Sequence, residues 1–525
     1  MAANITQKHV LPLLIIFAVA AAVNSILYLS TGISPAYNQS SDATVHMVQW
    51  QEYAKNYAGN FNSDVMFQNY QAQPTGTLFV DKVLVRIAEF LHIHLLDWSI
   101  IISCLNLVVF LSGVYVLVFY ATRSTLMAFV IGLVSIVPVI SLGLSGWGFL
   151  AIGFVPKEIS VSITVWLTIL YLQGVLTDSR LRIGLFFVLL GLFANWYPPA
   201  FFHYALVLIT VEVLRARAIR WEHILYGSAF LLAAPVALYD IFVKAAHFAP
   251  PVLSIIMDHY GAPLQSLSYL FVHYLRKQII YAVLVGALWC VYRRVLKKEY
   301  SPLMQAWYLI WWSTLLWSLV GVGIEVFAPL YMKYLISRIS VWFYLASMVI
   351  IAYTAYEIWI TKFGSTLGRK SLFAILTAGV LLGQTSVLSV YTGMREYQSN
   401  AEDYKQYLSV VTKLSSVVPR GSLVFANPDA GANTIRTYGG VGVYVAAKDG
   451  NVTLFDGVAA QAWFDRYKEV QKIFTQKDFS VIKRFAVAQG LQYYFFNTND
   501  IQKGSDALEK SAVLQFGNYG LAKLF

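Results

Sequence analysis

Charged side chains are what this 525-residue sequence most clearly lacks. Only 12% of its residues are Asp, Glu, Lys or Arg, whereas 58% are hydrophobic and the mean hydropathy is +0.60. Soluble domains are about a quarter charged and roughly half apolar. The sequence therefore excludes an ordinary soluble domain and predicts a polytopic α-helical membrane protein.

Cysteine and several catalytic motifs are also scarce or missing. Cys104 and Cys290 are the two cysteines, and both lie inside apolar runs, so we expect small buried hydrophobes rather than a disulfide or a CxxC metal site. The sequence has no zinc-ligand spacing, no nucleotide-cradling glycine loop and no serine-nucleophile motif. The missing phosphate loop argues against a nucleotide-driven pump. No internal repeat is apparent, although many secondary transporters carry one.

The basic residues lie mostly in short clusters between apolar runs. Lys and Arg number 38 against 27 Asp and Glu, which gives a net charge of +11. Clusters such as those at 215–220 and 293–298 are typical of the cytoplasmic loops of membrane proteins. We therefore expect no nucleic-acid partner, and Lys8 places the N-terminus in the cytoplasm.

The apolar runs predict about eleven membrane spans, since a helix needs about 20 apolar residues to cross the hydrocarbon core. The first is expected to be a retained signal anchor, and an odd number of spans leaves the C-terminus outside the cell membrane. Residues 31–97 form the first external loop. The expected spans are 9–30, 98–121, 125–145, 158–177, 182–196, 199–215, 222–243, 277–293, 302–327, 340–360 and 371–392.

From residue 393 the composition changes. Short apolar runs at 422–428, 442–447, 452–457 and 491–498 alternate with polar helical stretches, such as 462–474. This pattern predicts a small α/β domain. We thus expect a transmembrane domain at 1–392 and an extracytoplasmic α/β domain at 393–525.

One acid follows the first span closely, in the stretch YNQSSDATVHMVQW at 37–50. A serine at 40 or 41 suits a helix N-cap, which leaves Asp42 in the first turn, where a negative charge meets the positive end of the helix dipole. His46 and Trp50 follow at helical spacing and share a face with Asp42. Such a helix either roofs a polar site or rests on the bilayer, and Asp42 is either a helix-start residue or a catalytic base.

Two other segments place charges at the outer side of a predicted span. In VPKEIS at 155–160, Pro156 and Glu158 suit a helix start, whereas Lys157 in the same turn calls for an anionic partner. Arg338 enters the span at 340–360 from outside, which is costly unless the side chain faces protein, water or a phosphate. It either snorkels to lipid headgroups or binds a phosphate, which a guanidinium suits well.

The remaining polar candidates have weaker patterns. We expect Asp240, late in the span at 222–243, to be structural, and four residues of the first external loop to be solvated. These four are Asp64, Lys82, His92 and His94.

Together these features resemble the GT-C superfamily, membrane glycosyltransferases that use lipid-phosphate-linked sugars. Its members include protein mannosyltransferases, the aminoarabinose transferase of lipid A and oligosaccharyltransferases. Asp42 takes the position of an acid that follows the first span, and residues 69–93 resemble a proline-containing turn with an amphipathic return helix. Residues 155–172 and 337–352 resemble the segments in which a charged pair and an arginine precede later spans.

The resemblance implies transfer of a sugar from a polyprenyl-phosphate donor to a glycan, lipid or protein acceptor on the outer face, with inversion. By that resemblance Asp42 is the base, Lys157 and Arg338 neutralise the departing phosphate, Glu158 orients Lys157 or holds a cation, and His46 positions the acceptor.

Some relatives carry two adjacent acids, whereas Ser41 and Ala43 flank Asp42 here. The metal ligands are therefore unknown, a divalent cation is left open, and no other cofactor is indicated.

Three alternatives remain open from the sequence. A lipid-linked sugar transporter or flippase would show internal repeats and acids deep within spans. A non-catalytic scaffold would be built around the external tail. A polysaccharide polymerase or ligase shares the lipid-linked donor and would depend on arginines and a histidine in the later external loop at 244–276.

Overall fold

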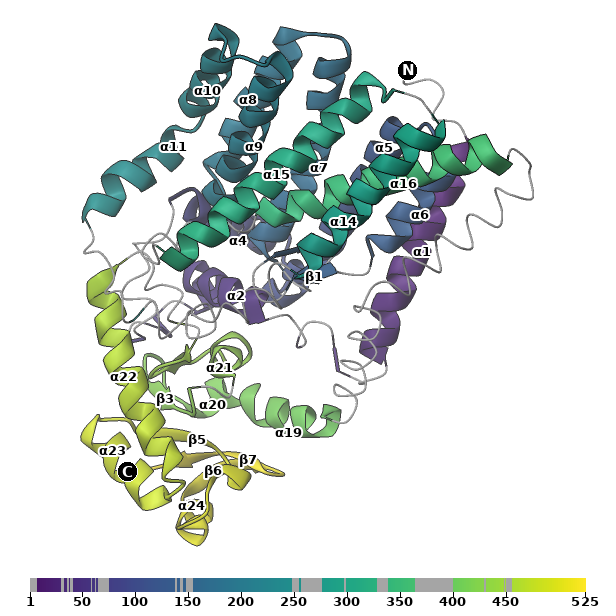
Figure 1. Ribbon diagram of the computed structural model, residues 1–525. Coiled ribbons are helices and arrows are strands. Elements are labelled where there is room, and N and C mark those ends of the chain that lie inside the picture. The colour runs from purple at the N-terminus through teal and green to yellow at the C-terminus, as the bar shows by residue number, and fades with distance from the viewer. Residues whose placement is uncertain are drawn as a thin grey trace.

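The structure is a computed structural model in which a helical bundle lies at one end and a small sheet with its own helices, the C-terminal tail, lies at the other (Figure 1). It describes residues 7–29, 33–34, 37, 41–57, 59–61, 63–64, 75–136, 139–141, 145–147, 154–247, 255, 276–296, 299–327, 339–363, 400–428, 431–447, 449 and 456–525.

The bundle consists of long apolar helices, as the hydropathy predicts. In the described part of the chain, five helices are apolar and long enough to cross a membrane, or six if a bent pair counts as one span. The fold is thus mostly helical and compatible with a membrane protein. The bundle helices are α1 (Gln7–Leu29), α5 (Leu95–Thr122), α6 (Thr125–Val134), α7 (Pro156–Leu176), α8 (Arg180–Ala194), α9 (Pro198–Ala216), α10 (Trp221–Ala233), α11 (Pro235–Leu238), α14 (Arg276–Val291), α15 (Pro302–Phe327) and α16 (Ser340–Phe363).

The expected span at 125–145 differs from the helix found there. Among the described residues of the run at 125–145, helix is confined to α6. Strand β1 (Val139–Ser141) follows in its second half and pairs antiparallel with β2 (Ser145–Trp147). Proline at 138 and glycines at 143 and 146 disfavour a continued helix. The span expected at 371–392 lies outside the described residues, so the total of eleven stays a prediction.

The span expected at 222–243 is broken. Helix α10 and the segment from Pro235 to Lys244 meet at a bend of 80°. Proline cannot donate to the preceding turn, so a new helix starts there. The side-chain oxygen of Asn195, at the corner between α8 and α9, accepts hydrogen bonds from the N–H groups of Val236 and Ala237 at 2.8 and 3.2 Å. Asn195 thereby satisfies the first turn of α11.

Helix α4 (Thr75–Phe90) is amphipathic, as expected for this part of the predicted first external loop. Its buried face includes Asp81, Val85 and Ala88, whereas its opposite side exposes four apolar residues at helical spacing. An exposed apolar stripe of this kind suits a helix that lies in a membrane interface. The exposed residues are Phe79, Val83, Ile87 and Phe90.

The start of α4 is fixed to the bundle by close contacts. The N–H and hydroxyl of Thr75 donate to the carboxylate of Asp240, at 2.7 and 2.5 Å, so Asp240 is structural, as expected. A Cβ added to Gly76 would lie only 1.6 Å from the carbonyl oxygen of Asn195, so only glycine allows this approach. The hydroxyl of Thr77 donates to the carbonyl of Trp196 at 2.8 Å.

The tail is an α/β unit with a mixed sheet in the order β4-β3-β5-β7-β6. Strand β3 (Leu423–Phe425) is parallel to both β4 (Gly442–Val443) and β5 (Tyr493–Asn497), while β7 (Tyr519–Lys523) is antiparallel to β5 and β6 (Ala512–Phe516). Three of the apolar runs and the helical stretch at 462–474 were predicted correctly, whereas the hairpin β6–β7 was not. The tail helices are α19 (Ala401–Val411), α20 (Leu414–Val417), α21 (Ala432–Gly439), α22 (Gly457–Thr475), α23 (Phe479–Ala488) and α24 (Ser505–Ser511).

Helix α2 (Ser41–Tyr53) lies between the bundle and the tail (Figure 1). Met47 and Trp50 of α2 share one apolar cluster with Val85 of α4 and with Leu408 and Ile435 of the tail. Because protein covers α2 on several faces, the interpretation that it rests on the bilayer is wrong.

The two cysteines are both exposed on the bundle, Cys104 on α5 and Cys290 on α14, so the expectation of buried thiols is also wrong. Apolar neighbours such as Leu105 and Trp289 are exposed with them, an arrangement compatible with helices that face lipid.

Candidate functional site

The start of α2 carries the predicted base. Helix α2 begins at Ser41, which puts Asp42 in its first turn and His46 one turn further, as expected. The side chain of Asp42 and all of Arg338 lie outside the described residues. Ile339 and Ser340, which follow Arg338, are buried at the start of α16.

The face of α2 that bears His46 and Trp50 packs against Phe154. The ring centroid of His46 is 5.7 Å from that of Phe154, edge to face, and that of Trp50 is 4.7 Å away. Phe154 is itself fixed, because its N–H donates to the hydroxyl of Ser99, near the start of α5, at 2.7 Å. Helix α7 begins two residues later, at Pro156. The face predicted from helical spacing is therefore in contact with the segment that leads into α7.

Lys157 and Glu158 occupy the first turn of α7, as the sequence predicts. Glu158 is only 8% exposed and Lys157 is half-buried. Val155, at the N-cap, provides no side-chain hydrogen bond, so the helix dipole at this end is complemented by the acid in the first turn. The structure thus brings His46, with Asp42 one turn before it, close to the segment that carries Lys157 and Glu158.

A buried carboxyl that is not among the predicted site residues lies next to Trp50 of this face. The indole N–H of Trp50 donates to Oδ1 of Asp81 at 2.9 Å, and Asp81 is 0% exposed. Its Oδ2 has no hydrogen-bond partner among the described residues. Burial raises the pKa of Asp81 from 3.8 to about 7, although the bond from Trp50 opposes the rise. The only signal in the sequence was an acid on the apolar face of a predicted amphipathic helix.

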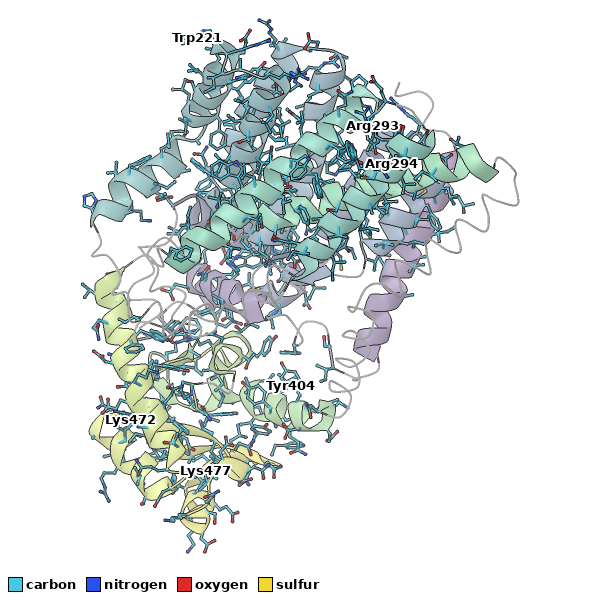
Figure 2. The ribbon with its side chains drawn as sticks, in the orientation of Figure 1. Trp221, Arg293, Arg294, Tyr404, Lys472 and Lys477 are labelled. Carbon is cyan, nitrogen blue, oxygen red and sulfur yellow. The ribbon has the colours of Figure 1, made fainter. Side chains whose placement is uncertain are left out.

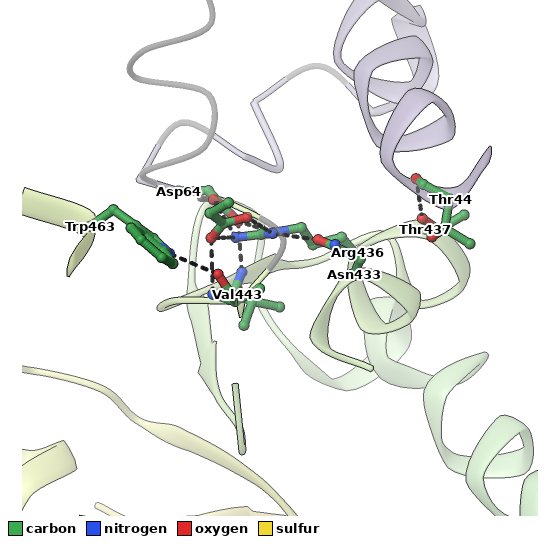
Figure 3. Close-up of polar contacts among 9 residues, drawn as sticks. Thr44, Asp64, Asn433, Arg436, Thr437, Val443 and Trp463 are labelled. Carbon is green, nitrogen blue, oxygen red and sulfur yellow. Dashed lines mark hydrogen bonds and ion pairs between the residues drawn. The ribbon is translucent and has the colours of Figure 1, made fainter. Parts of the chain in front are cut away.

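A second charged cluster joins the first loop to the tail. Arg436 of α21 is 0% exposed and lies between two carboxylates (Figure 3). Its Nε and Nη2 donate to Asp64 at 2.7 and 2.8 Å, and its Nη1 and Nη2 donate to Asp449 at 2.5 and 2.9 Å. Asp64 is 0% exposed, so the expectation that it would be solvated is wrong, whereas Lys82, His92 and His94 are exposed.

The carboxylates of this cluster also accept backbone hydrogen bonds. Val443 N–H donates to Asp64 at 2.8 Å and Ala446 N–H donates to Asp449 at 2.9 Å. Desolvation raises the pKa of Asp64, and the guanidinium of Arg436 opposes that rise. The pKa of Arg436 lies above its ordinary value, because the attraction of both carboxylates outweighs desolvation. The cluster therefore keeps its ion pairs while buried.

Neutral hydrogen bonds attach α2 to the same tail helix. The side-chain amide of Gln51 donates to the carbonyl of Thr437 at 2.6 Å. The hydroxyl of Thr437 donates in turn to the carbonyl of Thr44 at 2.9 Å (Figure 3). The position of α2, and with it the turn that contains Asp42, is thus set jointly by Phe154 on the bundle side and by α21 on the tail side.

A cavity of about 800 Å³ lies beside this junction, between the ends of α2 and α4 and the tail. Lys55, His92, His94 and Arg420 contribute to its wall, together with Glu89. Of the residues predicted for the site whose side chains the structure describes, His46, Lys157 and Glu158, none lines it. In the described ranges, no group of three His, Cys, Asp or Glu side chains could hold a metal ion.

No protein-family model matches this chain, and no curated protein matches its sequence. A function is therefore inferred from the residues of the site together with the resemblance in its motifs.

Proposed function

We propose that the protein is a membrane glycosyltransferase. It moves a sugar from a polyprenyl-phosphate donor to an acceptor at the outer face of the cell membrane, with inversion at the sugar carbon. The observation that best supports this proposal is the contact between the His46 face of α2 and Phe154, three residues before Lys157. This contact brings the segment with the proposed base near the proposed phosphate-binding turn.

In the proposed reaction, Asp42 takes the proton of an acceptor hydroxyl while that oxygen forms a bond to the anomeric carbon. The bond from that carbon to the phosphate oxygen breaks, and the polyprenyl phosphate leaves with the electron pair. Lys157 and Arg338 neutralise the charge of the leaving phosphate. Glu158, in the same turn, orients Lys157, and His46 positions the acceptor.

The distribution of basic residues supports the proposed orientation. Trp221, Arg293 and Arg294 lie in the part of the bundle away from the tail, whereas Tyr404, Lys472 and Lys477 lie on the tail (Figure 2). Basic clusters favour the cytoplasmic side. With the arginine-rich end in the cytoplasm, α2 and the tail are extracytoplasmic, in a chain divided into 1–392 and 393–525.

The test compares wild type with Asp42→Asn, in native membranes supplied with radiolabelled polyprenyl-phosphate hexoses and pentoses. Loss of a general base lowers the rate by about 100- to 10,000-fold, so transfer by a folded Asp42→Asn protein should fall in this range. Asp97→Asn, at an exposed acid near the start of α5, is the matched control and should retain transfer. Normal transfer by folded Asp42→Asn protein would reject Asp42 as the base. Movement of the donor across the membrane without transfer would favour the flippase.

A further inference from the structure

The tail contains a cavity of about 290 Å³ at the carboxyl ends of two neighbouring parallel strands. Asn427 follows β3, Asn497 ends β5, and both line the cavity. The size is near the lower end of small-ligand pockets, which measure about 300–1,000 Å³. Of the residues proposed for glycosyl transfer, the described His46, Lys157 and Glu158 do not line it.

The topology of the sheet makes this edge a place where ligands bind. From β3 the chain passes through α21 to β4 on one side of β3, and then through α22 and α23 to β5 on the other side. Neighbouring strands whose connections leave in opposite directions leave a crevice at their carboxyl ends, and ligands of α/β sheets bind in such crevices. The cavity lies at this switch between β3 and β5.

Aromatic rings form much of the cavity wall, and their positions are fixed. Tyr404 and Tyr407 stack with centroids 5.8 Å apart at 15°, and Phe474 and Tyr494 contribute further rings. The hydroxyl of Tyr404 donates to the carbonyl of Tyr37 at 2.8 Å, and that of Tyr407 donates to the carbonyl of Gly431 at 3.2 Å. Rings held in this way need no ordering when a ligand binds, which lowers the entropic cost of binding.

The polar groups of the wall are two amides and one acid. Asn427 and Asn497 provide amide side chains, and Asp500 provides a carboxylate that has no hydrogen bond to any described residue. No lysine or arginine lines the cavity among the described residues. A carboxylate without a neighbouring cation disfavours phosphate and other anions, since like charges repel at short distance.

We propose that the cavity at the carboxyl ends of β3 and β5 binds a neutral sugar residue. The apolar C–H face of a pyranose suits the electron-rich faces of the aromatic rings. Its hydroxyl groups can both donate to the Asp500 carboxylate and pair with the amides of Asn427 and Asn497. The tail is thus a carbohydrate-binding module, and this assignment does not depend on the transfer reaction proposed above.

Saturation-transfer NMR on the full-length protein in detergent tests the proposal. The probes are free hexoses, N-acetylhexosamines and pentoses, with inorganic phosphate and a nucleoside monophosphate as anionic comparisons. At least one neutral sugar should receive saturation from wild type, and its signal should fall at least fivefold with Asp500→Ala and with Tyr404→Ala. Asp506→Asn, an exposed acid in α24 away from the cavity, is the control and should leave the signal unchanged.

The outcomes separate this proposal from the proposed enzyme activity. Asp42→Asn should lose transfer and keep sugar binding, so failure of one proposal leaves the other standing. Because Asp500→Ala removes a half-buried carboxylate with no hydrogen bond to a described residue, we expect it to fold, and its melting temperature checks this. Binding of none of the neutral sugars, binding of the anionic probes alone, or an unchanged sugar signal in folded Asp500→Ala protein would overturn the assignment.

Discussion

Replacing Asp81 with asparagine should stabilise the protein at high pH and not at low pH. Asp81 is 0% exposed, accepts one hydrogen bond from Trp50, and has a pKa raised from 3.8 to about 7. Asparagine keeps an acceptor for the indole N–H and cannot ionise. The comparison therefore isolates the cost of a negative charge buried between α2 and α4.

The size of the effect follows from the pKa difference between the folded and unfolded chains. Below about pH 4 the carboxyl of Asp81 is neutral in both states, so its contribution to stability is fully present. Between pH 4 and pH 7 only the unfolded state ionises, so stability falls as the pH rises, and above pH 7 the loss is complete. The pKa rises from 3.8 to about 7 on folding. Because each unit of pKa difference corresponds to about 1.4 kcal/mol, ionisation of Asp81 lowers the free energy of unfolding by about 4 kcal/mol.

Hydrogen–deuterium exchange of peptides that contain α2 and α4, at pH 5 and pH 8, measures this cost. A difference of about 4 kcal/mol corresponds to about a thousandfold change in the population of locally opened molecules. At pH 8, Asp81→Asn should exchange far more slowly than wild type. At pH 5 this difference in exchange rate should be much smaller. Asparagine adds an amide whose N–H groups lack a described partner, which costs about 1–3 kcal/mol at every pH.

The unpaired amide shifts the stability of Asp81→Asn equally at every pH. A buried ionisable Asp81 is therefore recognised by the change with pH in the stability difference between wild type and Asp81→Asn. Asp97→Asn, at an exposed acid, should show little change in the same comparison. A difference between wild type and Asp81→Asn that is equal at pH 5 and pH 8 would refute the reasoning. The reasoning would also be refuted if Asp81→Asn were more strongly protected from exchange, relative to wild type, at pH 5 than at pH 8.

Two further substitutions test the packing around the first loop. Arg436→Met leaves two buried carboxylates without their cation and should cost about 3–5 kcal/mol, seen as at least 100-fold faster proteolysis of the tail. Exposed Arg484→Met should leave that rate unchanged, and equal rates for both variants would contradict the network. Gly76→Ala forces α4 away from the bundle corner and should cost about 1–3 kcal/mol, measured as a lower melting temperature. A Cβ added to Gly184 would have no heavy atom within 4 Å. Gly184→Ala should therefore raise the melting temperature slightly, because alanine favours a helix more than glycine does.

Helix positions and helix starts were predictable from the sequence where interactions within a single segment determine them. Helices α5, α7, α15 and α16 match the expected spans within a few residues, because long apolar runs and helix-starting prolines act within one segment. The same holds for the first turn of α7, with Lys157 and Glu158, and for the shared face of His46 and Trp50 on α2. Helices end before Pro235 and at Val134. The sequence contains helix-breaking residues near both places, but it does not predict the direction in which the chain continues.

Burial of charge was not predictable in this way. Asp64 reads as a loop acid, yet it is paired with Arg436, which lies 372 positions further along the chain. Gln51 and Thr437, in contact across the same junction, are 386 positions apart. No local pattern encodes a partner at such a distance, because the desolvation cost and the attraction that offsets it exist only once both segments have folded.

The sequence by itself determined three things: a mostly helical fold with long apolar helices, the positions of most of these helices, and the residue types at the proposed site. These follow from hydropathy, helical spacing and helix-end chemistry. Only the tertiary structure decided that α2 is enclosed between the bundle and the tail, and that Asp81 is buried beside Trp50. It alone also decided that two strands of the tail leave an aromatic cavity at their carboxyl ends. These features depend on which surfaces exclude water from one another, a property of the assembled chain.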